Sequence, residues 1–172
     1  EVIEAARPGL ADDAVLIDHS TTLPRLTAER AARLQAEGLH YLHCPVFMGP
    51  AAARQAQGKM LAAGPQAVYA RVAADLAKMT GHLEYLGERP DLAAVNKLLG
   101  NTMLIGSWAV IADVLSVAKA GGVAPEDAIK LLGMLDMNNV VSLRGGNMAK
   151  GNFAPSFELA MARKDIGLML ET

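Results

Sequence analysis

The feature that most constrains this fold is a change of pattern near residue 90. Before that point, short apolar runs of strand type alternate with helical segments, as where "AVLID" is followed by "LPRLTAERAARLQAEG". Such alternation is typical of an α/β sheet covered by helices. After that point the strand-type runs stop, and one helical segment follows another. The sequence therefore predicts an α/β part over residues 1–90 and an all-helical part over residues 91–172.

The α/β part can be divided into individual helices and strands. One helix is expected from Pro24, which suits a first turn, to Gly38, which suits a helix end. Another is expected over residues 65–81, because its valines share one face with Leu76 and Met79. Strands are expected over residues 14–18, 40–46, 59–64 and 82–87, and Pro45 is expected to end the second of them.

The helical part is expected to open with a long apolar helix. Asp91 can cap this helix, and a glycine pair after Ala120 can end it. A membrane-spanning helix needs about 20 apolar residues. The uncharged run 98–112 has only fifteen, and Asp113 follows it, so we expect no membrane span. Two further helices, "APEDAIKLLGML" and "SFELAMARKDIGLMLET", should flank "NNVVSLRGGNMAKGNFAP", which its glycines and asparagines are expected to break.

The charge balance argues against a polyanionic partner. The 172 residues carry a formal net charge of −2, and 4% of them are aromatic. Neither the basic surplus nor the stacking surface typical of nucleic-acid binding is present. The single cysteine, Cys44, excludes an internal disulfide, which fits a cytoplasmic location. The start, "EVIEAARPGL", lacks the features of a signal peptide. It also lacks an initiator methionine, so we expect a fragment of a longer protein.

Two polar residues interrupt the long apolar helix on one side. Lys97 and Asn101 stand four residues apart, so their side chains project from the same side. Burial of a lysine lowers its pKa, which suits proton transfer, and a neighbouring amide could hold a substrate oxygen. The alternative is a helix-end lysine that reaches into water and an asparagine that caps backbone groups.

Two loops at strand ends are candidate ligand sites. In "DHSTTLP", Ser20 and Thr21 follow a strand, and strand ends of α/β sheets border the ligand crevice. In "CPVFMG", Gly49 would let a ligand approach the backbone amides. The alternatives are ordinary capping before Pro24 and a tight loop followed by a short helix.

Lys164 in the last expected helix is a further candidate. It falls on the same face as Phe157, Met161 and Leu168, which is unusual for a surface charge, and Asp165 could be its partner or a residue of the helix surface.

The histidines do not predict a metal site. His40 and His43 would point to opposite faces of one strand, and Cys44 would point away from His43. No zinc-type spacing occurs, so we expect no bound metal.

The order of four motifs resembles the β-hydroxyacid dehydrogenase family, which includes 3-hydroxyisobutyrate dehydrogenase. These motifs are "DHSTTLP", "CPVFMG" with "QGKMLAAG", "NKLLGN" and "FELAMARKD". The resemblance implies a Rossmann-type α/β domain, a long connecting helix and an all-α domain like that of 6-phosphogluconate dehydrogenase. It also implies NAD or NADP as cofactor and interconversion of a small 3-hydroxy acid and its oxo form. Relatives of this kind associate through their helical parts, which implies a homodimer or homotetramer.

The resemblance also implies roles for individual residues. Lys97 matches the catalytic lysine, and Asn101 matches the asparagine that contacts the substrate. Ser20 and Thr21 match the strand-end pair beside the cofactor. Gly49 matches the last glycine of the substrate loop.

Two further matches lie in the last helix. Lys164 matches the C-terminal lysine near the nicotinamide, and Asp165 is its companion at the cofactor.

The sequence departs from the family pattern in two places. The substrate loop of the family usually reads Pro-Val-Ser-Gly-Gly, whereas Phe47 and Met48 stand here before the last glycine. This change favours a bulkier or less polar substrate, so an imine or semialdehyde reductase is an alternative. The glycine-rich G-x-G-x-x-G turn is also missing, so the fragment itself is expected to be inactive. A non-catalytic helical dimerisation module is the alternative from another class.

Overall fold

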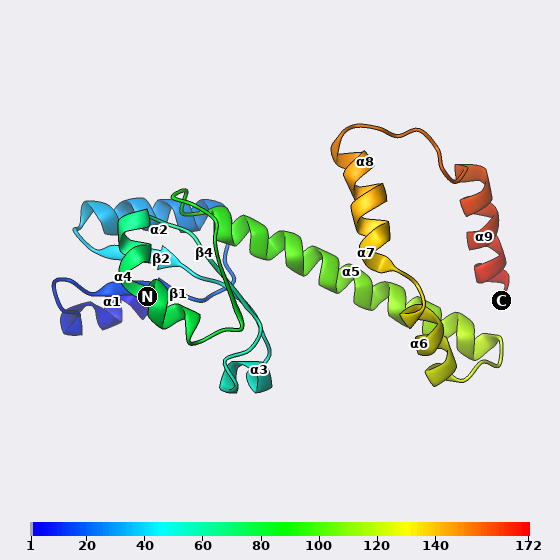
Figure 1. Ribbon diagram of the computed structural model, residues 1–172, viewed down its shortest axis with the longest axis horizontal. Coiled ribbons are helices and arrows are strands. Elements are labelled where there is room, and N and C mark those ends of the chain that lie inside the picture. Colours follow the sequence, from blue (N-terminus) through cyan, green and yellow to red (C-terminus); the bar gives the residue numbers. More distant parts are fainter. Residues whose placement is uncertain (1) are drawn as a thin grey trace. The chain divides into compact units, whose positions relative to one another are not determined.

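The computed structural model describes residues 2–172, which divide into two compact units (Figure 1). The first unit is Glu1–Leu104 and contains the strands, and the second is Ile105–Thr172 and is helical. The order of elements follows the predicted change from alternating strands and helices to helices alone.

Five short strands form the sheets of the first unit. They are β1 (Val15–Asp18), β2 (His40–His43), β3 (Val46–Phe47), β4 (Lys59–Ala62) and β5 (His82–Tyr85). β1 pairs with β2 in parallel, and β4 pairs with β5 in parallel. β3 pairs with β4 in the antiparallel sense, and a bridge between His43 and Ala63 links the two sheets. The strand expected over residues 40–46 ends before Pro45 as predicted, because proline has no N–H for a ladder hydrogen bond, and Val46 belongs to the separate strand β3.

The helices of this unit lie mostly between strands. They are α1 (Val2–Ala6), the 3₁₀ turn Arg7–Gly9, α2 (Pro24–Ala36), α3 (Pro50–Arg54) and α4 (Gln66–Ala77). α2 begins at Pro24 as predicted, and its end is followed by Gly38 with φ of +78°. α2 packs against β2, and α4 packs against β2 and β5 (Figure 1). The strands are thus held between helices, as the alternation predicted.

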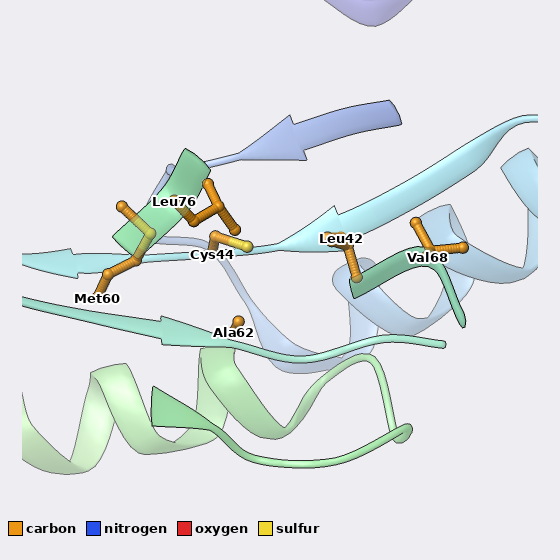
Figure 2. Close-up of a cluster of buried hydrophobic side chains, with 6 residues drawn as sticks. All are labelled: Leu42, Cys44, Met60, Ala62, Val68 and Leu76. Carbon is orange, nitrogen blue, oxygen red and sulfur yellow. The ribbon is translucent and has the colours of Figure 1, made fainter. Parts of the chain in front are cut away.

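A cluster of buried side chains holds α4 on the strands. Figure 2 shows its members, which come from the β2 region, β4 and α4: Leu42, Cys44, Met60, Ala62, Val68 and Leu76. Each large apolar side chain buried in this way contributes about 1.5–3 kcal/mol. Cys44 lies in this cluster while His43 contacts the loop after β1, so the two neighbours point apart as predicted.

The long helix α5 (Leu92–Ala120) runs without a break through the boundary between the units. Its first turns bury Ala93, Ala94 and Lys97, so they belong to the first unit. The boundary between the two compact units therefore falls inside α5. By length and mean hydropathy (1.6) α5 could cross a membrane. One such helix is weak evidence of a span, because core helices of soluble proteins have the same composition.

The second unit continues from α5 into shorter helices. They are α6 (Pro125–Gly133), α7 (Met137–Val140), the π-helical turn Val141–Gly145, α8 (Gly146–Ala149) and α9 (Leu159–Glu171). The expected break between α6 and α9 is wrong for residues 137–149, which form consecutive helical turns. Gly145 and Gly146 both adopt right-handed helical angles there, and the helical run ends before Gly151, whose φ is +67°.

Candidate functional site

Lys97 on the second turn of α5 is the central residue of the candidate site. Its side chain is buried, with 8% of the residue exposed. The Nζ atom lies over the Phe47 ring, 3.8 Å from the ring centroid. Burial lowers the pKa of Lys97 below its ordinary value. These observations contradict the solvated helix-end lysine and agree with the proton-handling alternative.

Two glycines fix the place of Phe47. A Cβ atom at Gly100 would lie 2.4 Å from Cζ of the Phe47 ring, so only glycine lets the ring touch this part of α5. Gly58 has φ of +96°, and a Cβ there would lie 2.8 Å from the Phe47 carbonyl oxygen. The ring therefore lies against α5, and the backbone of the same residue lies against the turn before β4.

Asn101 stands one turn after Lys97 on the same side of α5 and is half-buried. Among the described residues, its side-chain amide has no hydrogen-bond partner. Asn96 on the same helix differs, since its amide nitrogen donates to the Leu92 carbonyl at 2.9 Å. Asn101 is therefore not a capping residue, and its amide is available to a ligand beside Lys97.

A network of polar side chains lies at the carboxyl end of β1. Asp18 accepts hydrogen bonds from the Ser20 amide at 2.9 Å and from the Ser20 hydroxyl at 2.6 Å. Its second oxygen accepts from Tyr41 at 2.8 Å and from Arg30 at 3.0 Å. Desolvation raises the pKa of Asp18, but the hydrogen bonds from Ser20 and Tyr41 outweigh it and lower the pKa overall.

Both donors of Ser20 are thus used inside the chain, so Ser20 can offer a cofactor only the lone pairs of its hydroxyl. Thr21 is exposed beside it. The predicted strand-end pair therefore divides into one residue that shapes the loop and one whose hydroxyl faces outward.

Two histidines support the same loop, a role that was not predicted from the sequence. His43 is fully buried, and its Nε2 lies 2.9 Å from the Ser20 carbonyl oxygen. Its Nδ1 is buried without a partner among the described residues, and burial lowers the pKa of His43. His19 contacts the Cys44 carbonyl through Nδ1 at 2.7 Å. The sequence contained a signal for this role, because His19 directly follows β1 and His43 is the last residue of β2.

Met48 and Gly49 border a groove that Lys97 does not line. They line a groove of about 620 Å³ with His19, Met60 and other side chains, and neither Lys97 nor Phe47 lines it. Gly49 has open space where a Cβ would stand, so a ligand can approach its backbone from that groove. The residues predicted as one substrate loop thus face two places, with Phe47 at the lysine and the next two residues at the groove.

Lys164 and Asp165 lie on α9 in the second unit. Their side chains form an ion pair at 2.8 Å and are 55% and 42% exposed. Asp165 is thus both the partner of Lys164 and a residue of the helix surface, and Lys164 is not buried among apolar side chains. Their predicted place at the cofactor stays a prediction.

Within residues 2–172, no three His, Cys, Asp or Glu side chains gather in a way that could hold a metal ion.

Comparison with protein families gives one match over the first half of the chain. Residues 1–87 match the NAD binding domain of 6-phosphogluconate dehydrogenase. Among curated proteins, 2-hydroxy-3-oxopropionate reductase of Escherichia coli (strain K12) is 25% identical over 91% of this chain and 54% of its own length. The 3-sulfolactaldehyde reductase of the same strain is 27% identical over 95% and 55%. Mitochondrial 3-hydroxyisobutyrate dehydrogenase of Drosophila melanogaster is 25% identical over 96% and 53%.

Solved structures give the same fold. The imine reductase of Streptomyces aurantiacus has a TM-score of 0.84 at 22% identity, over 99% of this chain and 61% of that one. An imine reductase variant from Myxococcus stipitatus in complex with NAD⁺ has a TM-score of 0.81 at 17% identity, over 98% and 63%. The expected Rossmann-type α/β part, long helix and helical part are thereby confirmed. The chain spans about half the length of the curated relatives it matches.

Proposed function

The chain belongs to the family of the NAD binding domain of 6-phosphogluconate dehydrogenase, and from this premise we propose that the protein is an NAD(P)-dependent oxidoreductase. Its reaction would interconvert a small 3-hydroxy acid and its oxo form. Relatives named as reductases and dehydrogenases of small oxygenated compounds support this proposal. The observation that carries it is the buried Lys97 beside an Asn101 amide that has no partner in the described chain.

Lys97 would handle the proton of the reaction. A bound nicotinamide supplies or accepts the hydride, and the protein supplies position and proton transfer. In the oxidative direction, the O–H bond of the substrate breaks and its proton passes to the neutral Lys97 amine. In the reverse direction, the Lys97 ammonium returns a proton to the carbonyl oxygen. A lowered pKa makes both forms of the lysine accessible nearer neutral pH.

Asn101 would orient the reacting oxygen. Its amide lies one helical turn from Lys97, so one substrate oxygen can meet both side chains. Small errors of position are costly in such a reaction, which favours two groups on one rigid helix over groups on a mobile loop.

The described residues fit part of a dinucleotide. The exposed Thr21 hydroxyl at the end of β1 can contact the cofactor where strand ends border the crevice. The 172 residues contain no G-x-G-x-x-G turn, so we assign no diphosphate contact. Both NAD and NADP are candidate cofactors.

The contact between Phe47 and Lys97 favours a second candidate, reduction of an imine or a semialdehyde. The ring places an apolar surface beside the lysine, where a serine would offer a hydroxyl to a substrate carboxylate. A panel of hydroxy acids, semialdehydes and cyclic imines, each with NADH and NADPH, separates the candidates. A strong preference for short hydroxycarboxylates would exclude the imine alternative.

Replacement of Lys97 tests the proposal directly. Lys97→Ala in the full-length protein should lower kcat/KM by about 100-fold or more, the range typical of general acid–base catalysis. Lys119→Ala is the matched control, because Lys119 lies on the exposed last turn of the same helix. If Lys97→Ala keeps turnover of the best substrate within a few-fold of normal, the assignment is wrong.

We also propose self-association through the helical unit. Among its described residues only Ala128 is buried, and large apolar side chains such as Leu159 and Leu170 are more than 80% exposed. Exposed apolar surface of this kind favours association. Light scattering on the purified protein should give at least twice the mass of one chain, and a monomer at micromolar concentration would contradict this.

A further inference from the structure

We propose that Phe47 is a positioning residue for Lys97, whose ammonium its ring holds in place, and that Gly100 provides the space for that ring. The importance of this contact for catalysis rests on the proposed function. The contact itself can be tested without any substrate.

The position of Lys97 leaves the ring as its electrostatic partner. The distance of 3.8 Å from Nζ to the ring centroid is well inside the range of about 6 Å for a cation–π contact. Among the described residues, Lys97 has no ion pair and no side-chain hydrogen bond. A buried lysine without any partner would be costly, so the ring face supplies the stabilisation that a carboxylate supplies elsewhere.

Lys164 illustrates the alternative arrangement, in which a carboxylate is the partner of the ammonium. Its ammonium is paired with Asp165 at 2.8 Å, so one of its three N–H donors is occupied by a carboxylate. A ring face attracts the charge of Lys97 but has no lone pair to accept a directed hydrogen bond from its N–H groups. The N–H groups of Lys97 therefore stay available to a substrate oxygen, which a paired lysine would offer less readily.

The ring is held where it is needed. A Cβ at Gly100 would lie 2.4 Å from Cζ and 2.7 Å from Cε1 of Phe47, so the ring occupies the space that a side chain would fill. Lys97 and Gly100 are three residues apart and therefore neighbours on one face of α5. A Cβ at Gly58 would lie 2.8 Å from the Phe47 carbonyl oxygen, so the backbone of Phe47 also passes close to this turn, and its ring lies against a lysine side chain that is otherwise flexible.

Two effects on the protonation of Lys97 oppose each other. Burial lowers the pKa of Lys97, and it is the cause that accounts for the shift. The face of the ring favours the charged form and so limits that fall. Loss of the ring without entry of water should therefore lower the pKa further, whereas loss of the ring with entry of water should raise it.

The experiment is an NMR titration of the Lys97 side chain in variants of Phe47. Phe47→Leu keeps an apolar side chain without a ring and should lower the pKa of Lys97 by about one unit, the size of a desolvated cation–π contact. Phe47→Ser admits water and should raise the pKa towards its ordinary value. Phe47→Tyr is the control, because it keeps the ring, and the pKa should stay within about 0.3 units.

The kinetic readout separates positioning from folding. Phe47→Leu should lower kcat by about tenfold and change KM by less than about threefold. Phe47→Tyr, which keeps the ring, should keep kcat close to that of the unchanged protein. If Phe47→Leu does not fold, Phe47→Met carries the same prediction. The proposal is overturned if the leucine and serine variants both leave the pKa of Lys97 unchanged, even when they melt at lower temperature.

The outcomes for the contact and for the proposed function are distinct. Normal turnover in Lys97→Ala would refute the role of the lysine in the reaction, and the titration would still decide whether Phe47 holds the ammonium. If the pKa of Lys97 is unchanged in the Phe47 variants while Lys97→Ala loses turnover, the contact is refuted and the proposed function stands.

Discussion

Asp18 and His43 stand opposite each other in the register of β1 and β2, and both bind Ser20. The carboxylate accepts from the amide and hydroxyl of Ser20, while the imidazole contacts its carbonyl oxygen. The loop that leaves β1 towards α2 is therefore held from two strands at once. Its backbone conformation should depend on both side chains.

Asp18→Ala should destabilise the protein. The change leaves Ser20, Tyr41 and Arg30 without their shared acceptor, and the Asp18 side chain is only 17% exposed. Groups left unsatisfied at such a site cost about 2 kcal/mol in the free energy of unfolding. Urea denaturation measures this loss, and Asp12→Ala, at an exposed position, is the control. Equal stability of the two variants would contradict the role of the network.

His43 should make stability depend on pH. Its pKa is lowered by burial, so in mild acid the unfolded chain takes up a proton that the folded chain resists. The contribution of His43 is therefore fully present above its unfolded pKa of about 6.5 and is lost as pH falls towards the lower folded pKa. The free energy of unfolding should fall between pH 7 and pH 5 by up to about 1.4 kcal/mol per unit.

Variants of histidine assign that slope. His43→Gln should remove most of it, although the variant itself starts from a lower stability at pH 7. His82→Gln changes an exposed histidine on β5 and should keep the slope. A slope that survives in His43→Gln would place its origin in another group.

Cys44 should resist thiol reagents in the folded protein. It is fully buried, and burial raises the pKa of its thiol to about 12, so almost no reactive thiolate forms at neutral pH. Reaction with an aromatic disulfide reagent should be at least about 100-fold slower in buffer than in denaturant. Rapid labelling under native conditions would show that the cluster around Cys44 opens readily.

Gly58→Ala should be strongly destabilising. The position has φ of +96°, and a Cβ there would lie 2.7 Å from Cβ of Met48 and 2.8 Å from the Phe47 carbonyl oxygen. Strain of this kind costs about 2 kcal/mol or more, and it would displace the residue that contacts Lys97. Gly9→Ala is the matched control, since nothing lies within 4 Å of its Cβ position. Thermal denaturation of both variants tests the difference.

Local pattern was sufficient for most of the fold. The strand positions and the start of α2 at Pro24 depend on neighbouring residues, so periodicity and turn chemistry predicted them. The helical residues 137–149 were missed, because Gly145 and Gly146 have weak helix propensity but adopt helical angles in place. The end of the second strand at Pro45 was predicted from the missing N–H of proline, whereas the place of Val46 in the separate strand β3 was not.

The site was predicted only as far as one helix face. The side shared by Lys97 and Asn101 follows from helical spacing, and both residues lie as that spacing requires. The partner of Lys97 could not be predicted, because Phe47 is fifty positions away and its place depends on the antiparallel pairing of β3 with β4. Met48 lines a groove that Lys97 does not line, and this arrangement also depends on long-range packing.

The absence of a carboxylate beside Lys97 in the described chain has an electrical consequence. A ring face attracts a cation but carries no net charge, so it does not neutralise the charge of protonated Lys97. Only ions or ligands from solution would then neutralise the charge of Lys97. Anionic molecules should therefore be drawn in, and dissolved salt should weaken that attraction by screening.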